Sequence, residues 1–349
     1  YVIQLFESSY YVSDGLYKEF CVVATENNTK VTITPHANTV DGRKPQMPYE
    51  ITLQRGQVYM VHSADENLNL SGSHMISNNP IAVFAGHVAA LVPDGNFAAD
   101  HIVEQQLPIN MWGKKFALTK TYGQTGAYVM LTTMSDDTEV FLNGTLVFTL
   151  DKLDSYTFRL TESSSFVETS NPVACYLYVE GGQSNNDVGD PSSVLISPIE
   201  QRIQEVTFAT FETNLSRSHY VNIVTTKNGV TDITLDHVSI SNQFKSLKGS
   251  DEFVFAQIPI EHGTHTLSTN KDGFIGHVYG LGAYESYAYS IGSSTLNLAG
   301  QIIIGGVINS DMDTTIERCY KKPITFSPQT NDDYDEIEWN FGDGNTSNE

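Results

Sequence analysis

Apolar and polar residues alternate with a period of two in several parts of the chain. The alternation is clearest at residues 30–34 (KVTIT), 155–160 (SYTFRL) and 231–235 (TDITL). It predicts β-strands with one buried face, because successive side chains of a strand point to opposite sides of the sheet. No segment shows a convincing helical period, and Pro108 limits any helical turn within residues 100–110. We therefore expect an all-β protein.

The predicted strands belong to a module that occurs three times. Its opening phrases are FCVVAT and TKVTI within 20–33, YVMLTT and TEVFL within 128–142, and YVNIVT and TDITL within 220–235. Its closing phrases are SNNPIAVF at 77–84, SNPVACY at 170–176 and the looser TNKDGFIGH at 269–277. Repetition at this spacing indicates that copies of one β-rich module build the protein.

The spacing predicts three β-sandwich-like repeats packed together, at residues 1–92, 93–190 and 191–290. The connectors share the phrases EQQLPI and ISPI and are short, so we expect the repeats to contact one another. Inside the second repeat, Asn143 and Gly144 predict a tight hairpin, since a type I′ turn needs positive φ at both central positions.

The composition suits strands, and the charge argues against polyanionic partners. Hydrophobic residues make up 40% of the chain and charged residues 17%, with 18 Tyr and 17 Phe, which suits half-buried strands. Acidic residues outnumber basic residues 41 to 19, and the net charge of −22 would repel nucleic acid and anionic membranes. This charge serves either solubility or the attraction of Ca²⁺ and basic proteins.

The three cysteines show no disulfide framework. Cys21 and Cys175 lie in apolar strand patterns, where a thiol acts as a small hydrophobe, and Cys319 is either a free thiol or paired beyond this chain. The sequence opens in a strand-like run without a signal-peptide pattern, and its longest apolar stretch, 81–92, is too short to cross a bilayer. We expect a trimmed soluble fragment with no direct membrane insertion.

The sequence contains none of the common catalytic signatures HExxH, GxSxG, GxxxxGKS/T or CxxC. Its best cluster of ionisable residues is Asp94, Asp100 and Glu104, which lie with His101 on a connector. These carboxylates could bind Ca²⁺, and a pair of them could hydrolyse a glycosidic bond. The competing interpretation is structural, with the side chains bonded to the connector backbone. We predict no catalytic residue and no cofactor other than calcium.

Tyrosines gather at two ends of the predicted repeats. Three lie at one end of the first repeat and three at the end of the third: Tyr10, Tyr11, Tyr17, Tyr284, Tyr287 and Tyr289. Tyrosine supplies a broad contact area with a polar tip, so these six are the predicted binding residues. Because alternate residues of a strand point inward, core packing or contact between repeats competes with partner binding.

A different module is predicted after the third repeat. Residues 291–315 are expected to be bridging strands or a linker, and residues 316–349 contain the phrase IEWNFGDGNTS. This phrase resembles the signature of polycystic-kidney-disease (PKD) domains, which are immunoglobulin-like sandwiches. Because the chain stops at Glu349, we expect only the first strands of such a sandwich.

Four phrases resemble the N-terminal domain of IgGFc-binding proteins: DHIVEQQLPI at 100–109, WGKKF at 112–116, HVYG at 277–280 and ESYAY at 285–289. The resemblance implies extracellular interaction, since vertebrate members are secreted mucus proteins credited with binding the Fc part of immunoglobulin G. The PKD-like phrase and the few cysteines are more similar to the bacterial members, which are surface or secreted proteins. The family supplies no binding residue that transfers to a position of this sequence.

These features predict a non-enzymatic interaction module that is secreted or lies at the surface of a bacterium. Its role would be adhesion or the binding of a host glycoprotein. Its partner would be an extracellular protein or glycan, such as a mucin, an immunoglobulin or a polysaccharide. Two alternatives stay open. One is a polysaccharide-processing enzyme or accessory carbohydrate-binding module, and the other is a structural stalk that spaces neighbouring domains.

Overall fold

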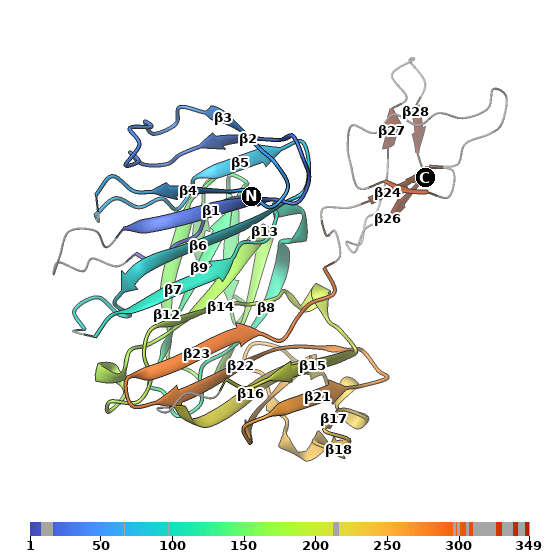
Figure 1. The fold of residues 1–349 in the computed structure, drawn as a ribbon. Helices are drawn as coiled ribbons and strands as arrows, with labels where there is room; N and C mark the ends of the chain where they lie inside the picture. The colour runs from blue at the N-terminus through green and yellow to red at the C-terminus, as the bar shows by residue number, and fades with distance from the viewer. Residues whose placement is uncertain are drawn as a thin grey trace. The chain divides into compact units, whose positions relative to one another are not determined.

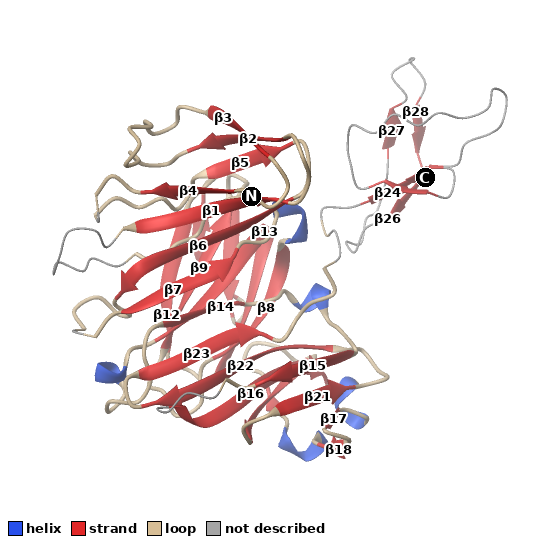
Figure 2. Ribbon diagram, viewed as in Figure 1, coloured by secondary structure: helices blue, strands red, loops and turns tan. Residues whose placement is uncertain are grey.

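The computed structural model describes residues 1–7, 17–65, 67–96, 98–211 and 216–295, with short C-terminal pieces at 298, 301–304, 307–309, 326–329, 338–340 and 346–348. The chain divides into two compact parts, residues 1–295 and 296–349. Within the described residues the strands pair antiparallel and every helix is a single 3-10 turn, so the all-β prediction is confirmed (Figure 2). None of these helices has the length and apolar character needed to traverse a membrane.

The first repeat is a sandwich of two sheets (Figure 1). Their strand orders are β4-β1-β6-β7 and β3-β2-β5, and Val2 bridges His74 at the edge of the second of these sheets. The strands are β1 (Lys18–Ala24), β2 (Thr29–Thr34), β3 (Tyr49–Leu53), β4 (Val58–His62), β5 (His74–Ser77), β6 (Ile81–Ala90) and β7 (Asp100–Gln105).

The second repeat has the same strand order, but its long strand β13 belongs to both sheets. One order is β12-β9-β13-β14, and the other is β11-β10-β13-β8, with β8 in the place of the N-terminal segment. Asn143 and Gly144 turn β10 into β11 with φ of 51° and 79°, as the sequence predicts. The strands are β8 (Gly113–Thr119), β9 (Ala127–Thr133), β10 (Thr138–Leu142), β11 (Thr145–Leu150), β12 (Ser155–Leu160), β13 (Ser164–Val179) and β14 (Ser192–Leu195).

The third repeat follows the same plan with the orders β19-β20-β16-β22-β23 and β15-β21-β17-β18. Its strands are β15 (Glu205–Ala209), β16 (Ser216–Thr226), β17 (Thr234–Leu235), β18 (Val238–Ser239), β19 (Lys245–Ser246), β20 (Phe253–Ile260), β21 (Thr264–Ser268), β22 (Phe274–Gly282) and β23 (Glu285–Ser290). The 3-10 turns are η1 (Ile109–Met111), η2 (Gly182–Ser184), η3 (Ile199–Gln201), η4 (Gly229–Thr231) and η5 (Ser241–Gln243). In every repeat we call the sheet with β1, β9 or β16 the first sheet and the other the second sheet.

An apolar core lies between the two sheets of each repeat, and the core residues correct the alignment of the opening phrases. Phe20, Val129 and Val221 occupy equivalent core positions. The phrases instead place Phe20 beside Tyr128 and Tyr220, which lie one residue earlier and pack outside the cores of their own repeats. A slip of one residue moves a strand side chain to the opposite face of its sheet, so only the burial pattern reveals the equivalence.

In the first two repeats, the last strand follows the loop in which we predicted a boundary. β7 pairs with β6, and β14 pairs with β13, so the first sheets extend past the predicted boundaries at residues 92 and 190. β14 in turn contacts both β7 and β23. The last strands of the three repeats therefore meet along β14 in the compact part at residues 1–295.

The second compact part contains β24 (Gln301–Ile304), β25 (Val307–Asn309), β26 (Phe326–Gln329), β27 (Glu338–Asn340) and β28 (Thr346–Asn348). β24 pairs with β25 and β26, so strands predicted to bridge from the third repeat pair with a later strand. β27 pairs with β28, and Trp339 lies opposite Ser347. Residues 341–345 of the PKD-like phrase and Cys319 lie outside the described residues.

Candidate functional site

Two predicted tyrosines lie in one aromatic cluster at the end of the third repeat. Tyr287 and Tyr289 of β23 stack with their ring centroids 6.3 Å apart, and Phe211 contacts them at 5.0 and 5.5 Å. The Tyr287 hydroxyl lies 2.9 Å from Nδ1 of His219, and the Tyr289 hydroxyl donates to the carbonyl of Ala209. Burial raises the pKa of Tyr287 to about 12. The two tyrosines are half-buried supports, whereas Phe211 is 55% exposed.

The third predicted tyrosine, Tyr284, lies on a separate group of loops. Its hydroxyl donates to the carboxylate of Asp187, and this bond raises the pKa of Tyr284. The neighbouring Val188 is exposed, and its carbonyl accepts a hydrogen bond of 2.9 Å from Gln124. Tyr122, two residues before Gln124, is 51% exposed. We call Tyr122, Val188 and Tyr284 the loop surface.

Aromatic stacking supports one side of the loop surface. Tyr122 stacks on Tyr220 with a centroid distance of 5.0 Å, and Tyr220 stacks on the buried Tyr279 at 5.5 Å. The Tyr279 hydroxyl accepts a hydrogen bond of 2.8 Å from the Tyr122 backbone and donates to Asn222. This column of rings joins the second repeat to the third and holds the Tyr122 side chain at the surface.

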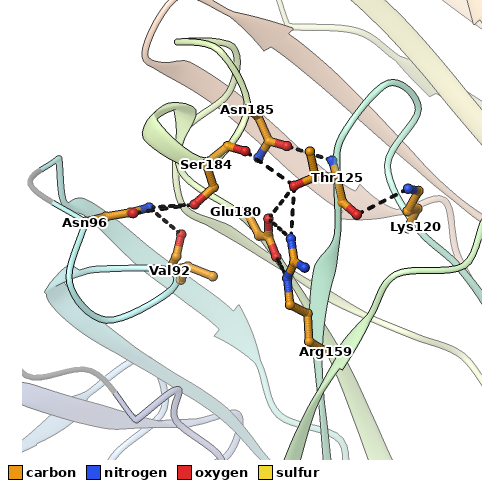
Figure 3. Close-up of polar contacts among 8 residues, drawn as sticks. All are labelled: Val92, Asn96, Lys120, Thr125, Arg159, Glu180, Ser184 and Asn185. Atoms are coloured by element: carbon orange, nitrogen blue, oxygen red, sulfur yellow. Dashed lines mark hydrogen bonds and ion pairs between the residues drawn. The ribbon is translucent and has the colours of Figure 1, made fainter.

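An ion pair between the buried Glu180 and Arg159, whose side chain is 38% exposed, ties the loops around this surface (Figure 3). Glu180 is fully buried and accepts two hydrogen bonds from Arg159, at 2.6 Å from Nε and 3.0 Å from Nη2. The Thr125 hydroxyl lies 3.2 Å from the same carboxylate, and it accepts a bond of 2.9 Å from Arg159. A Cβ at Gly126 would lie only 2.7 Å from Oε1 of Glu180, so a larger residue here would displace the ion pair.

The same network reaches two further loops (Figure 3). The Thr125 backbone N–H donates to Oδ1 of Asn185 at 2.7 Å, and the Thr125 hydroxyl lies 3.3 Å from the carbonyl of Ser184. Asn96 donates to the carbonyl of Val92 at 3.0 Å and lies 3.4 Å from the hydroxyl of Ser184. Loops from the first and second repeats are thus tied together, and loops fixed by a rigid scaffold commonly carry binding residues.

Of the three tyrosines predicted for the first repeat, the structure describes Tyr17. Tyr17 is partly buried, and its ring lies edge-on to His62 at a centroid distance of 6.2 Å. His62 forms an ion pair of 3.2 Å with Glu19. Tyr10 and Tyr11 lie outside the described residues.

The predicted calcium ligands have different surroundings. The carboxylate of Glu104 is mostly buried and accepts backbone hydrogen bonds from Gln105 at 3.2 Å and Leu195 at 3.3 Å, and burial raises its pKa to about 7. Asp100 accepts the backbone N–H of His101 at 2.7 Å, and Asp94 is exposed. No group of three or more His, Cys, Asp or Glu side chains within the described part of the chain could hold a metal ion. Through its hydrogen bond from Leu195, Glu104 links β7 to β14.

Two open clefts lie between the first and second repeats. One, of about 370 Å³, is lined by Phe6, Asp94 and Tyr128, and Glu7 and Thr157 line both this cleft and the other, of about 330 Å³. Neither Asp100 nor Glu104 lines these clefts, although glycoside hydrolysis by the predicted cluster requires two of its carboxylates to face each other. This placement does not favour the enzyme alternative.

The sequence singled out Tyr284, but it did not single out the exposed Phe211, Tyr122 and Val188. One available signal was a large side chain directly before a loop glycine, as in Tyr122-Gly123 and Val188-Gly189. Such residues lie at turns, where a bulky side chain without a neighbouring strand projects into solvent. Phe211 carries no comparable signal, because it directly follows an apolar strand phrase.

The fold and its surfaces define a protein of three β-sandwich repeats that presents aromatic side chains on fixed loops. Residues 1–280 match the family described as IgGFc binding protein, and the chain belongs to this family. The human protein named IgGFc-binding protein is 27% identical to it over 126 residues, which is 36% of this chain. The chain spans only 2% of the length of that relative. No solved structure matches this chain.

Proposed function

We propose that the chain is a non-catalytic extracellular binding module that recognises a protein or glycoprotein through its loop surface. One observation carries the proposal: Tyr122, Val188 and Tyr284 are exposed on loops that are tied together around Arg159 and the buried Glu180. A fixed loop loses little conformational entropy when it binds, and exposed tyrosines contribute strongly to protein interfaces. Membership of the IgGFc-binding family supports an extracellular binding role.

The partner class follows from the family name and from the charge. The human relative is named for binding the Fc part of immunoglobulin G, so we propose a secreted or surface glycoprotein, immunoglobulins and mucins included, as the partner class. A net charge of −22 favours a partner with a basic patch. We also propose a bacterial surface protein whose role is adhesion to a host; the few cysteines support the bacterial origin.

Binding of the purified chain to immobilised immunoglobulin G Fc, a mucin and a polysaccharide panel tests this function, with calcium and with a chelator. We expect one protein ligand to be retained. The double variant Tyr122→Ala/Tyr284→Ala should weaken binding at least about tenfold, because truncating a central aromatic residue costs over 1.4 kcal/mol. Tyr156→Ala is the matched control, since Tyr156 is exposed on β12, away from these loops.

Each other outcome of this screen has a distinct meaning. Retention of no ligand would contradict the binding function and favour the stalk. Retention that the double variant leaves unchanged would contradict the loop surface, and Phe211→Ala would then test the aromatic cluster. Release of sugars from the polysaccharide panel would establish the enzyme alternative. Loss of binding in chelator would support a calcium site, and Asp94→Asn would then test its location.

We further propose that residues 316–349 begin a PKD-type domain. The phrase around Trp339 and the antiparallel pairing of β27 with β28 support this assignment. A structure of a longer chain with no immunoglobulin-like sandwich after residue 316 would contradict it.

A further inference from the structure

Neighbouring repeats pack in the same way at both junctions. At the first junction, Val2 and Phe6 of repeat 1 form a buried apolar cluster with Met130, Ala174 and Tyr176, which lie on the outer face of the first sheet of repeat 2. The N-terminal segment, whose Val2 bridges the edge of the second sheet, thus covers part of the first sheet of repeat 2, and Ala90, Val92 and Ile102 of β6, the following loop and β7 join the same cluster.

The second junction repeats this arrangement. Ala117 and Phe166 of repeat 2 form a buried cluster with Val224, Phe255 and Ile275, which lie on the outer face of the first sheet of repeat 3. Each repeat therefore presents its second sheet to the first sheet of the repeat that follows it.

Strand register shows that the two junctions use equivalent positions. On the covering side, the bridge between Val2 and His74 corresponds to the pair Ala117 and Phe166. On the outer face of the first sheet, the equivalent cross-strand pairs in the three repeats are Cys21 with Phe84, Met130 with Tyr176, and Asn222 with His277. The pairs in repeats 2 and 3 are buried, whereas Cys21 and Phe84 remain partly exposed.

The outer face of the first sheet in repeat 1 is apolar like its counterparts, but among the described residues of 1–295 its side chains stay partly exposed. We call it the open face. Its residues lie on β4, β1 and β6 and are Val58, Met60, Cys21, Val23, Ala82 and Phe84. On the edge strand, Val58 is 57% and Met60 47% exposed. None of the six carries a charge, and the Glu19–His62 ion pair lies at one end of the face. An apolar centre with a polar rim is typical of a protein interface.

The opposite end of the array is closed by polar residues. In repeat 3 the position of Ala117 and Phe166 is occupied by Thr207 and Thr266, whose hydroxyls lie 3.1 Å apart within hydrogen-bonding distance. Terminal repeats of an array commonly have such polar outer faces. A second copy could not cover the open face with this end without burying both hydroxyls against apolar side chains.

We propose that the open face pairs with the open face of a second copy of this chain in a two-fold symmetric dimer. Two-fold symmetry brings an apolar, uncharged face against its equal, which the head-to-tail arrangement cannot do here. The six side chains would fill the space between two sheets about 10 Å apart, as in a sandwich core. Because the chain carries a net charge of −22, two copies repel each other over most of their surface, and the open face is a route of approach without charged groups.

Sedimentation of the complete chain over a range of concentrations tests the dimer. We expect reversible dimerisation that Met60→Lys weakens at least tenfold, because each lysine would be desolvated in the interface. Ile76→Lys is the matched control, since Ile76 is 73% exposed on β5 of the same repeat and lies outside the open face. Unfolding midpoints of both variants would establish that the fold is retained.

Salt provides a second measurement. Raising the ionic strength from about 0.05 M to about 0.5 M should tighten the dimer, because salt screens the repulsion between acidic surfaces without weakening apolar contact. A chain that stays monomeric at every concentration and salt level would overturn the proposal. A dimer that Met60→Lys leaves intact would overturn it as well, as would a dimer that dissociates when salt is added.

Discussion

Repeats 1 and 2 place an aromatic residue at the same position of the same sheet, but the two residues have different surroundings. Phe84 on β6 is partly exposed, whereas its counterpart Tyr176 on β13 is 1% exposed beneath repeat 1. Tyr176 also donates a hydrogen bond of 3.2 Å to the carbonyl of Gln105. The difference shows that neighbours, and not the repeat itself, decide whether a residue on this face belongs to a core or to a surface.

Alanine substitutions of Tyr176 and Phe84 should differ most strongly in their effect on the free energy of unfolding. Tyr176→Ala removes a large buried ring and a hydrogen bond, so we expect a loss of about 4 kcal/mol in the free energy of unfolding. Phe84→Ala should cost about 1 kcal/mol in the monomer, because its ring already contacts water. Urea unfolding at low protein concentration measures both. Equal losses would mean that the open face is covered within the chain.

The comparison extends to two buried carboxylates, of which only one has a cationic partner. Glu180 is paired with Arg159, and removing the guanidinium leaves a buried charge. We therefore expect Arg159→Ala to cost about 3 kcal/mol, at the lower end for a broken buried pair because Arg159 is partly exposed. The double variant Arg159→Ala/Glu180→Gln should recover most of this loss. A loss of under 0.5 kcal/mol, as expected for ordinary surface substitutions, would show that the pair does not hold the loops.

Glu104 is the carboxylate without a cationic partner in its hydrogen-bond set. Its pKa of about 7 in the folded state lies above the ordinary value of 4.5, so the folded state binds the proton more tightly than the unfolded state. The stabilisation from this group is complete below pH 4.5 and is lost as the pH rises to 7. Glu104→Gln should remove this dependence and stabilise the chain at pH 8 by roughly 2 kcal/mol. Unfolding midpoints at pH 5 and pH 8 measure the change, and an equal effect at both pH values would contradict this assignment.

The sequence predicted much of what local chemistry determines. Alternation identified strands such as 30–34 and 155–160, and Asn143-Gly144 identified a hairpin, because both patterns depend on nearby residues. It did not predict the burial of both faces in β9 and β13, where one face fills the core and the other meets a neighbouring repeat. That burial depends on contacts between distant parts of the chain.

In the candidate site, too, some features follow from nearby residues and others depend on contacts between distant parts of the chain. Tyr284 could be singled out from composition at a module end, but its partner Asp187 comes from a loop 97 residues earlier in the chain. The role of Glu104 as a link between β7 and β14 likewise requires Leu195 beside it. A single sequence supplies neither pairing, since no local pattern connects residues so far apart.

We expect the smallest change in stability at the polar end of the array. There, substitutions can turn a polar surface into an apolar one like those at the junctions between repeats. Thr207→Val/Thr266→Val replaces two hydroxyls at an exposed pair, so the free energy of unfolding should change by less than about 0.5 kcal/mol. The variant would then present an apolar second sheet that matches the covering side of the other junctions. Because this end and the open face are different surfaces, their contact is head-to-tail, and we expect rings or open chains of copies larger than a dimer. Light scattering against concentration measures their growth, and Thr207→Ser/Thr266→Ser is the control that keeps both hydroxyls. A variant that never exceeds the size of the parent would indicate that apolar matching alone does not drive this packing.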